Sequence, residues 1–111
     1  MRIAFLTLGC KLNYAETSTY ERGFTANGLE VVPLEEQADV YLINTCSVTE
    51  RAEKKCRNVI RKMHRTSPGA RIIVTGCYAE LRRNDLLAID GVSLVFGAKE
   101  KSRVVPDTME L

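Results

Sequence analysis

The sequence has no apolar run long enough to cross a membrane and no leader for export. Its first ten residues hold a short apolar stretch behind a single arginine, which is too little for a signal peptide. We therefore interpret this stretch as a strand, and we expect a cytoplasmic protein that does not associate with a membrane. Without an export signal, the four cysteines argue against a disulfide framework. In a reducing compartment they are metal ligands, nucleophiles or small core residues.

The sequence also lacks a C-x-x-C pair of the kind found in zinc sites, and a glycine-rich phosphate loop after its first apolar run. It has no internal repeat and no low-complexity segment. The net charge of +2 is too small to indicate nucleic-acid binding by itself. The chain has 111 residues, of which 45% are apolar and 27% are charged. This length and composition suit one domain with a core and a polar surface.

Apolar runs alternate with helical patterns along the chain. We predict strands at 3–8, 29–32, 40–43, 72–75 and 92–96, and helices between 13 and 28, between 47 and 66, and between 78 and 87. This order predicts an α/β fold with three layers, in which a mostly parallel five-stranded sheet has the flavodoxin-like order 2-1-3-4-5. Segment 33–39 then serves as a crossover without a helix. Segment 99–111 is expected to hold a turn of helix and then a tail.

Three of the cysteines follow predicted strands. Cys10 comes after the first strand, Cys46 after the third and Cys77 after the fourth. These strands are neighbours in the predicted order, and parallel strands end at the same edge, so three loops there span roughly 10 Å. Gly9 and Gly76 precede two of the cysteines and allow the backbone to come close to a bound group. The sequence therefore predicts one metal site shared by three thiolates.

The remaining candidate ligands do not join this site. Cys56 lies on the apolar stripe of the long helix, where a cysteine serves as a small core residue. The lone His64 comes late in that helix, away from the strand ends. Three thiolates without a fourth protein ligand leave one metal position open, as a reactive centre requires and a structural one does not.

Polar residues flank the cysteine loops. Asn13 with Glu16, and Ser47 with Glu50, have the spacing of capping boxes at the starts of two helices. Asn13 and Asn44 are both candidates for orienting a substrate or donating to sulfide. Capping is the favoured role of Asn13, so Asn44 is the better functional candidate. Tyr78 either lines the site or packs on the sheet, and the sequence does not decide between the two.

Three segments resemble the cysteine motifs of the radical-SAM methylthiotransferases. They are Leu8–Asn13, Asn44–Thr49 and Thr75–Ala79, which occur in the family's order and together with their spacing cover most of the chain. The resemblance is to the amino-terminal domain of that family. Lys11 after the first cysteine, and Ser47-Val48-Thr49 after the second, are similar to the subgroup that acts on N6-threonylcarbamoyladenosine in tRNA.

The resemblance implies that residues 1–98 form an iron–sulfur domain in which Cys10, Cys46 and Cys77 ligate a [4Fe–4S] cluster. It implies that residues 99–111 lead toward a radical-SAM domain, with a second [4Fe–4S] cluster and S-adenosylmethionine, and that an RNA-binding domain and a tRNA substrate belong to the whole enzyme. The C-x-x-x-C-x-x-C motif of the radical-SAM domain is absent here. This fragment is therefore expected to bind a cluster without turning over. A zinc-binding module and a metal-free flavodoxin-like binding module are the alternatives.

The long helix is strongly basic. It carries seven of the sixteen lysines and arginines of the chain: Arg51, Lys54, Lys55, Arg57, Arg61, Lys62 and Arg65. These residues either contact tRNA phosphates or form a solvated helix face. The modest net charge and the scarcity of interleaved aromatic residues favour the solvated face.

Overall fold

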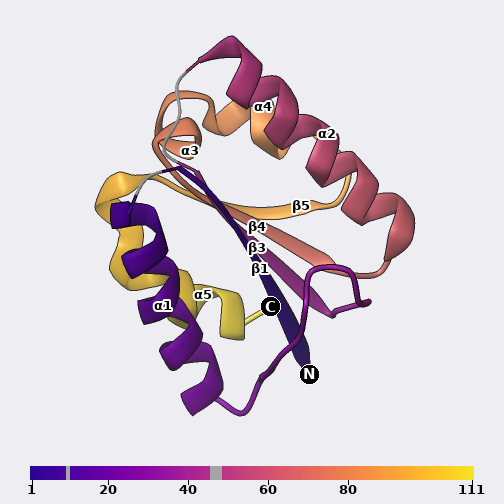
Figure 1. Cartoon of the computed structure of the whole chain (residues 1–111), viewed down its shortest axis with the longest axis vertical. Helices are drawn as coiled ribbons and strands as arrows, with labels where there is room; N and C mark the ends of the chain where they lie inside the picture. Colours follow the sequence, from indigo (N-terminus) through magenta and orange to yellow (C-terminus); the bar gives the residue numbers. More distant parts are fainter. Residues whose placement is uncertain (10, 46–48) are drawn as a thin grey trace.

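The computed structural model of the chain describes residues 1–9, 11–45 and 49–111. In this part of the chain, five strands form one parallel sheet in the order β2-β1-β3-β4-β5 (Figure 1). The predicted α/β class and the order 2-1-3-4-5 are thus confirmed. The strands are β1 (Arg2–Leu8), β2 (Glu30–Val31), β3 (Val40–Thr45), β4 (Arg71–Gly76) and β5 (Val92–Phe96).

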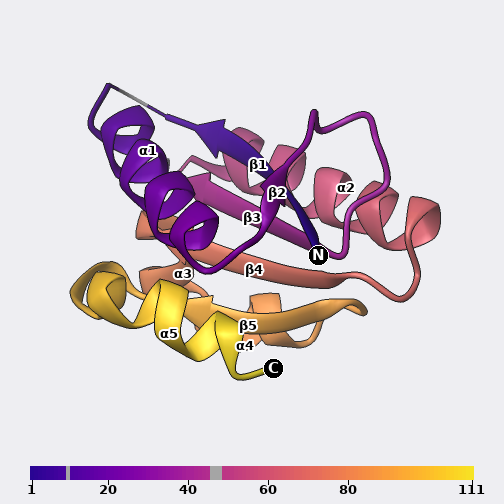
Figure 2. The same cartoon turned by 90° about the horizontal axis from the view of Figure 1, so that it is seen from below.

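Helices cover both faces of the sheet, which gives the three predicted layers (Figure 2). One face packs against α1 (Lys11–Ala26) and α5 (Val104–Met109), and the other against α2 (Glu50–Thr66), α3 (Cys77–Leu81) and α4 (Arg83–Leu87). All six residues of β3 are buried, because this central strand is enclosed on both faces. The continuous apolar run in the sequence has its physical origin in this double coverage.

Two hydrophobic cores lie on opposite sides of the sheet. On the α1 side, Phe24 and Val104 are fully buried against strand residues such as Leu42. On the α2 side, Cys56 and Ile60 are equally buried. Along β3, Tyr41 and Ile43 belong to the core on the α2 side and Val40 and Leu42 to the core on the α1 side, since successive side chains of a strand point to opposite faces.

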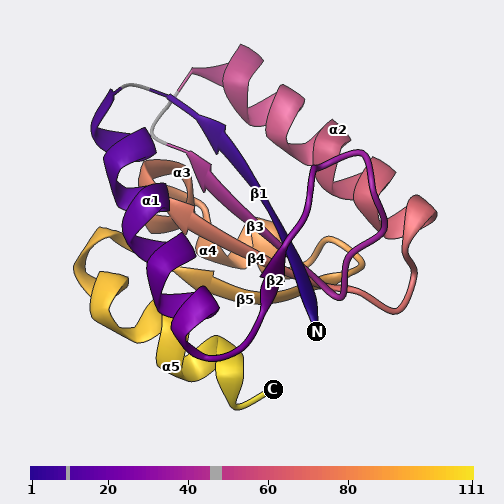
Figure 3. The ribbon, with the colours of Figure 1, turned by 60° about the horizontal axis from the view of Figure 1, so that its bottom comes forward.

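The connection from β2 to β3 has no helix, as predicted. Residues 32–39 form a loop that starts at the two-residue edge strand β2 and passes beside α2 (Figure 3). Pro33 lies two residues after the end of β2 and has no backbone N–H to continue the strand pairing, which suits the edge of a sheet. Because no crossover helix covers this end of the sheet, the α2 face of β1 is only partly enclosed.

The starts of the two long helices differ from the prediction. The first begins at Lys11, so Asn13 lies inside its first turn and is not an N-cap. The side chain of Asn13 is used in a contact with β3 instead, described below. The second begins at Glu50 with Thr49 as its N-cap, whose Oγ1 accepts from the backbone N–H of Ala52 at 3.2 Å. The predicted cap Ser47 lies outside the described residues.

The predicted helix 78–87 is two short helices separated at Arg82, whose backbone is not helical (φ −131°, ψ 37°). After β5 the chain has more helix than the single predicted turn. A 3₁₀ helix, η1 (Ala98–Arg103), leads into α5. Val104 is fully buried in the core on the α1 side, so this segment packs on the domain and does not form a free tail. Whether it leads to a further domain stays a prediction.

Candidate metal centre at the carboxyl edge of the sheet

The strands that precede the three candidate cysteines end in register. Leu8 of β1 pairs with Thr45 of β3, and Thr45 pairs in turn with Gly76 of β4. These three strand ends are called the carboxyl edge below. In the sequence, the cysteines come two residues after the first of them and one residue after each of the others. The parallel register therefore starts all three cysteine segments from one line across the sheet.

Cys77 is the candidate ligand that the structure describes, since Cys10 and Cys46 lie outside the described residues. It is the first residue of α3, and its thiol is exposed and free. The next two residues, Tyr78 and Ala79, are buried in the core on the α2 side. Cys77 is thus held at the surface of the carboxyl edge by a firmly packed anchor.

Gly76 sets the direction in which the chain leaves β4. Its backbone has φ 110° and ψ −165°, a region that is essentially restricted to glycine. A Cβ at this position would overlap the carbonyl oxygen of Thr45 on the neighbouring strand. Gly9, before the other glycine-preceded cysteine, also has a positive φ, of 153°. At Gly76 the absence of a side chain allows a close approach to the backbone of Thr45. That the two glycines bring the backbone close to a bound group stays a prediction.

Asn13 and Asn44 lie together behind the carboxyl edge and bind each other. Asn44 is 1% exposed, and its Nδ2 donates to the carbonyl oxygen of Asn13 at 3.0 Å and to Oγ1 of Thr17 at 3.3 Å. Asn13 is also buried, and its Nδ2 donates to Oδ1 of Asn44 at 3.1 Å. The pair connects the first turn of α1 to the end of β3. This arrangement holds the two segments that flank Cys10 and Cys46 in the sequence at a fixed separation.

Tyr78 packs in the core and does not line an open site. Its ring is 2% exposed, and its hydroxyl accepts a hydrogen bond from Nη1 of Arg57 on α2 at 3.1 Å. That hydrogen bond is the main reason why the pKa of Arg57 is raised. Tyr78 therefore fixes α3 against α2. Of the two roles that the sequence left open for it, packing is the one that the structure shows.

A lysine that the sequence analysis missed lies near Cys77. Lys101 of η1 forms an ion pair with Glu16 of α1. Its pKa is raised chiefly by this contact with Glu16, and to a smaller extent by the charges of Tyr20 and Cys77. Its position follows from the packing of η1 and α5, for which the sequence carried no local signal.

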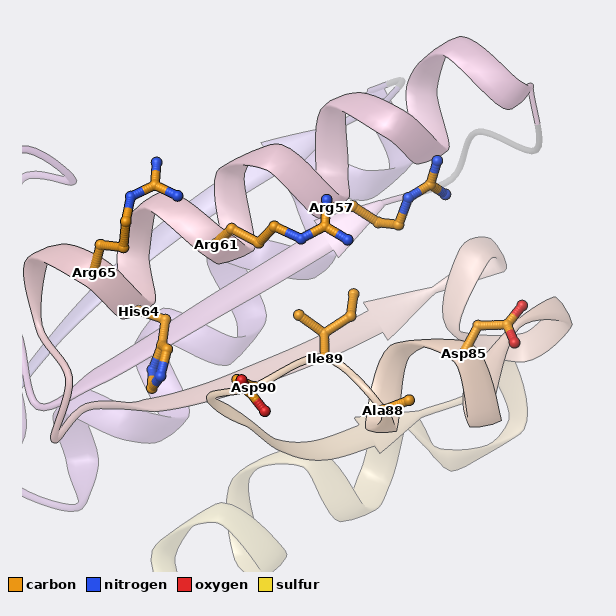
Figure 4. Close-up of a pocket in the computed structure, with 8 residues that line it drawn as sticks. All are labelled: Arg57, Arg61, His64, Arg65, Asp85, Ala88, Ile89 and Asp90. Atoms are coloured by element: carbon orange, nitrogen blue, oxygen red, sulfur yellow. The ribbon is translucent and has the colours of Figure 1, made fainter.

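Cys56 and His64 lie away from the carboxyl edge. Cys56 is 0% exposed in the middle of α2, and burial raises the pKa of its thiol to about 11. His64 is in the last turn of α2, next to Gly91 and Asp90 before β5, which is the opposite edge of the sheet (Figure 4). Within residues 1–9, 11–45 and 49–111, no group of three or more histidine, cysteine or acidic side chains is placed to hold a metal ion.

The sequence model of the uncharacterized protein family UPF0004 matches residues 2–97. The chain is 44% identical over 103 residues to the threonylcarbamoyladenosine tRNA methylthiotransferase MtaB of Bacillus subtilis (strain 168), with 93% of this chain and 23% of that relative covered. For the protein of the same name from Aquifex aeolicus (strain VF5), the identity is 40%, with 95% and 26% covered. A tRNA-2-methylthio-N(6)-dimethylallyladenosine synthase of Fervidobacterium nodosum is 31% identical, with 98% and 24% covered. The chain spans about a quarter of the length of these relatives. None of its described helices is long and apolar enough to span a membrane.

Proposed function

We propose that Cys10, Cys46 and Cys77 ligate a [4Fe–4S] cluster. The chain belongs to the UPF0004 family, and its relatives are named as methylthiotransferases, the family that its cysteine motifs resemble. The observation that carries this proposal is the register of Leu8, Thr45 and Gly76, which begins the three cysteine segments side by side. Adjacent strands lie about 4.8 Å apart, so the three loops are within reach of one cluster.

The surroundings of Cys77 fit such a group. Its thiol is exposed, the glycine before it leaves no side chain between backbone and ligand, and Lys101 adds a positive charge nearby. Three cysteine thiolates are the donor set that iron–sulfur clusters use, one short of a full set of four. When bound, the cluster supplies an iron without a protein ligand, where the sulfur destined for the substrate has a coordination position.

The chain's own residues would hold the proposed cluster, and with it the iron that has no protein ligand, in a fixed place. The Asn13–Asn44 pair fixes α1 against β3, and Gly76 with Tyr78 fixes the start of α3 against α2. Asn44 immediately precedes Thr45 and Tyr78 immediately follows Cys77, so both contacts lie next to the carboxyl edge. We assign Asn13 and Asn44 to positioning the cysteine loops, because their side-chain amides are already used on each other and on Thr17.

The larger reaction follows from the relatives, which are named as tRNA methylthiotransferases. In a longer cytoplasmic protein, a radical-SAM domain with a second [4Fe–4S] cluster and S-adenosylmethionine would act with this domain on tRNA. The substrate would be N6-threonylcarbamoyladenosine at position 37, next to the anticodon, and the product its 2-methylthio derivative. The 111-residue chain alone would bind the cluster but would not turn over.

Anaerobic reconstitution with iron and sulfide tests the ligand set. The chain and its Cys10→Ala, Cys46→Ala, Cys77→Ala and Cys56→Ala variants are compared by visible absorption and by bound iron per chain. We expect the unmodified chain to turn brown and to bind iron. The brown colour and the bound iron should be lost in each of the first three variants and retained in Cys56→Ala. Loss in Cys56→Ala together with retention in any of the other three would refute the ligand set. A chain that binds zinc stoichiometrically but never develops charge-transfer absorption would support a zinc module instead.

A further inference from the structure

The basic residues of α2 line two different hollows, and the two sets meet on the solvent side of the helix at Lys54. Arg51, Lys54, Lys55 and Lys62 follow the i, i+3, i+4, i+11 spacing of one helix face, here called the lysine face. Arg57, Arg61 and Arg65 follow the i, i+4, i+8 spacing of another, here called the arginine face. The buried stripe that contains Cys56 and Ile60 turns toward the sheet and separates the two on the inner side. The sequence alone had treated all seven residues as one surface.

Carboxylates accompany the arginine face. It lines a cavity of about 520 Å³ between α2 and the α4–β5 segment, and Asp85 and Asp90 line the same cavity (Figure 4). Arg57 already donates to the hydroxyl of Tyr78. Two negative charges in the lining offset much of the attraction that this cavity would have for an anion.

Fewer carboxylates lie near the lysine face, where four basic residues have Glu35 as the carboxylate in an adjoining groove. This face lines a shallow hollow of about 400 Å³ together with Asn58 and Val59, and the lining contains no carboxylate. Its four basic side chains are exposed, and among the described residues none of the four forms an ion pair or a hydrogen bond. Lys54 makes no contact of this kind with Glu50, although that residue lies one turn earlier. The cations of the lysine face are therefore available to an external anion.

The hollow continues toward the proposed cluster site. A second groove of about 400 Å³ shares Lys55, Val59 and Lys62 with it and runs between α2 and β1. Leu6 and Leu8 of β1 line this groove together with Leu34 and Glu35 of the loop 32–39. Glu35 is the carboxylate in its lining. Leu8 is the residue from which the first cysteine loop starts. The two hollows thus share three lining residues, and the second one reaches Leu8 at the carboxyl edge.

We propose that the lysine face binds the phosphodiester backbone of an RNA strand and so holds it beside the carboxyl edge. This rests on the proposed function, in which the longer protein acts on tRNA. Lysines with mobile side chains suit such contacts, because a backbone contact needs charge more than fixed geometry. Contacts of this kind position a nucleic acid without reading its sequence. The larger excess of positive charge on this face, four basic residues near one carboxylate against three near two, distinguishes it from the arginine face of the same helix.

The test compares two variants that each remove two positive charges from α2. Lys55→Gln/Lys62→Gln removes them from the lysine face, and Arg61→Gln/Arg65→Gln removes them from the arginine face. A fluorescently labelled anticodon stem–loop RNA is titrated with each 111-residue protein, and Kd is measured by anisotropy from about 50 to 200 mM salt, the range over which phosphate contacts weaken strongly. Circular dichroism melting checks that both variants fold like the unmodified chain.

We expect the lysine variant to bind about tenfold more weakly at 100 mM salt, with its log Kd versus log salt slope reduced by about 1.4, or about 0.7 for each lost phosphate contact. The arginine variant should keep nearly the original slope. Equal losses in the two variants, or no loss in the lysine variant, would overturn the assignment of the lysine face. Binding of polyglutamate at this face with no measurable RNA binding would also overturn it, in favour of an acidic protein partner.

The same proteins keep this proposal separable from the proposed function. RNA binding is measured on the metal-free chain, and cluster content is measured after reconstitution of both variants. A cluster that forms normally in both variants, with equal RNA affinity in both, would overturn only the lysine face. A loss of RNA binding confined to the lysine variant, in a chain that never assembles an iron–sulfur cluster, would support the lysine face and overturn the proposed cluster.

Discussion

Cys56 and Cys77 lie on the same side of the sheet but in opposite surroundings. Cys56 is 0% exposed in the middle of α2, whereas Cys77 is exposed at the first residue of α3, directly after a strand end. Burial raises the pKa of the Cys56 thiol to about 11, which disfavours the thiolate form that binds metal. The contrast teaches that the position of a cysteine relative to the strand ends decides between a core residue and a candidate ligand.

The largest expected effect comes from changing the backbone that presents Cys77. Gly76→Ala would place a Cβ against the carbonyl of Thr45, in a backbone region that only glycine adopts readily. We expect a loss of about 4 kcal/mol or more in the free energy of unfolding, measured by urea denaturation. Gly69→Ala is the matched control, because a Cβ there has nothing within 4 Å and the backbone needs no positive φ. Equal losses in the two variants would mean that the carboxyl edge imposes no special requirement on Gly76.

The next largest effect concerns the buried amide pair behind the carboxyl edge. Asn44→Ala removes three hydrogen bonds and leaves the Nδ2 of Asn13 without its partner on β3. We expect a cost of about 3 kcal/mol in unfolding free energy, since each buried polar group left unpaired costs about 1–3 kcal/mol. A double-mutant cycle with Asn13→Ala should give a coupling energy of about 1 kcal/mol or more. Additive losses would show that the two asparagines act independently and do not fix α1 against β3.

Much of the fold was predictable because its signals are local. The alternation of strand and helix patterns, with a short second strand near Pro33 as an edge, predicted the sheet order, and the amphipathic pattern of α2 predicted one helical layer. The role of Asn13 was not predictable, since its partner Asn44 is 31 residues away and a capping pattern is read only from neighbours. The break at Arg82 has no glycine or proline to mark it, and α5 is held by the burial of Val104, which depends on tertiary packing.

The candidate site was predictable only in part. The prediction that Cys56 is a core residue is confirmed, because an apolar stripe with helical spacing is a local pattern. The placement of Cys77 at a strand end follows equally from the predicted strand. The ligand roles of Cys10, Cys46 and Cys77 stay a prediction. The separation of the α2 charges into two faces required the positions of Asp85 and Asp90 on other elements, which no helical pattern contains.

The smallest expected effect tests the Cys56 side of the contrast through pH. Because the pKa of this thiol rises from 9.0 to about 11 on folding, its contribution to stability is fully present below about pH 9 and is lost as the pH rises toward 11. At pH 10 the unmodified chain should have lost about 1 kcal/mol more than Cys56→Ala, relative to pH 8. Chemical denaturation of both proteins without metal at each pH measures this difference, and the subtraction cancels the titration of Tyr20, whose pKa burial also raises. Parallel pH profiles would mean that the thiol of Cys56 ionises as readily in the folded chain as in the unfolded one, and the contrast with Cys77 would then rest on exposure alone.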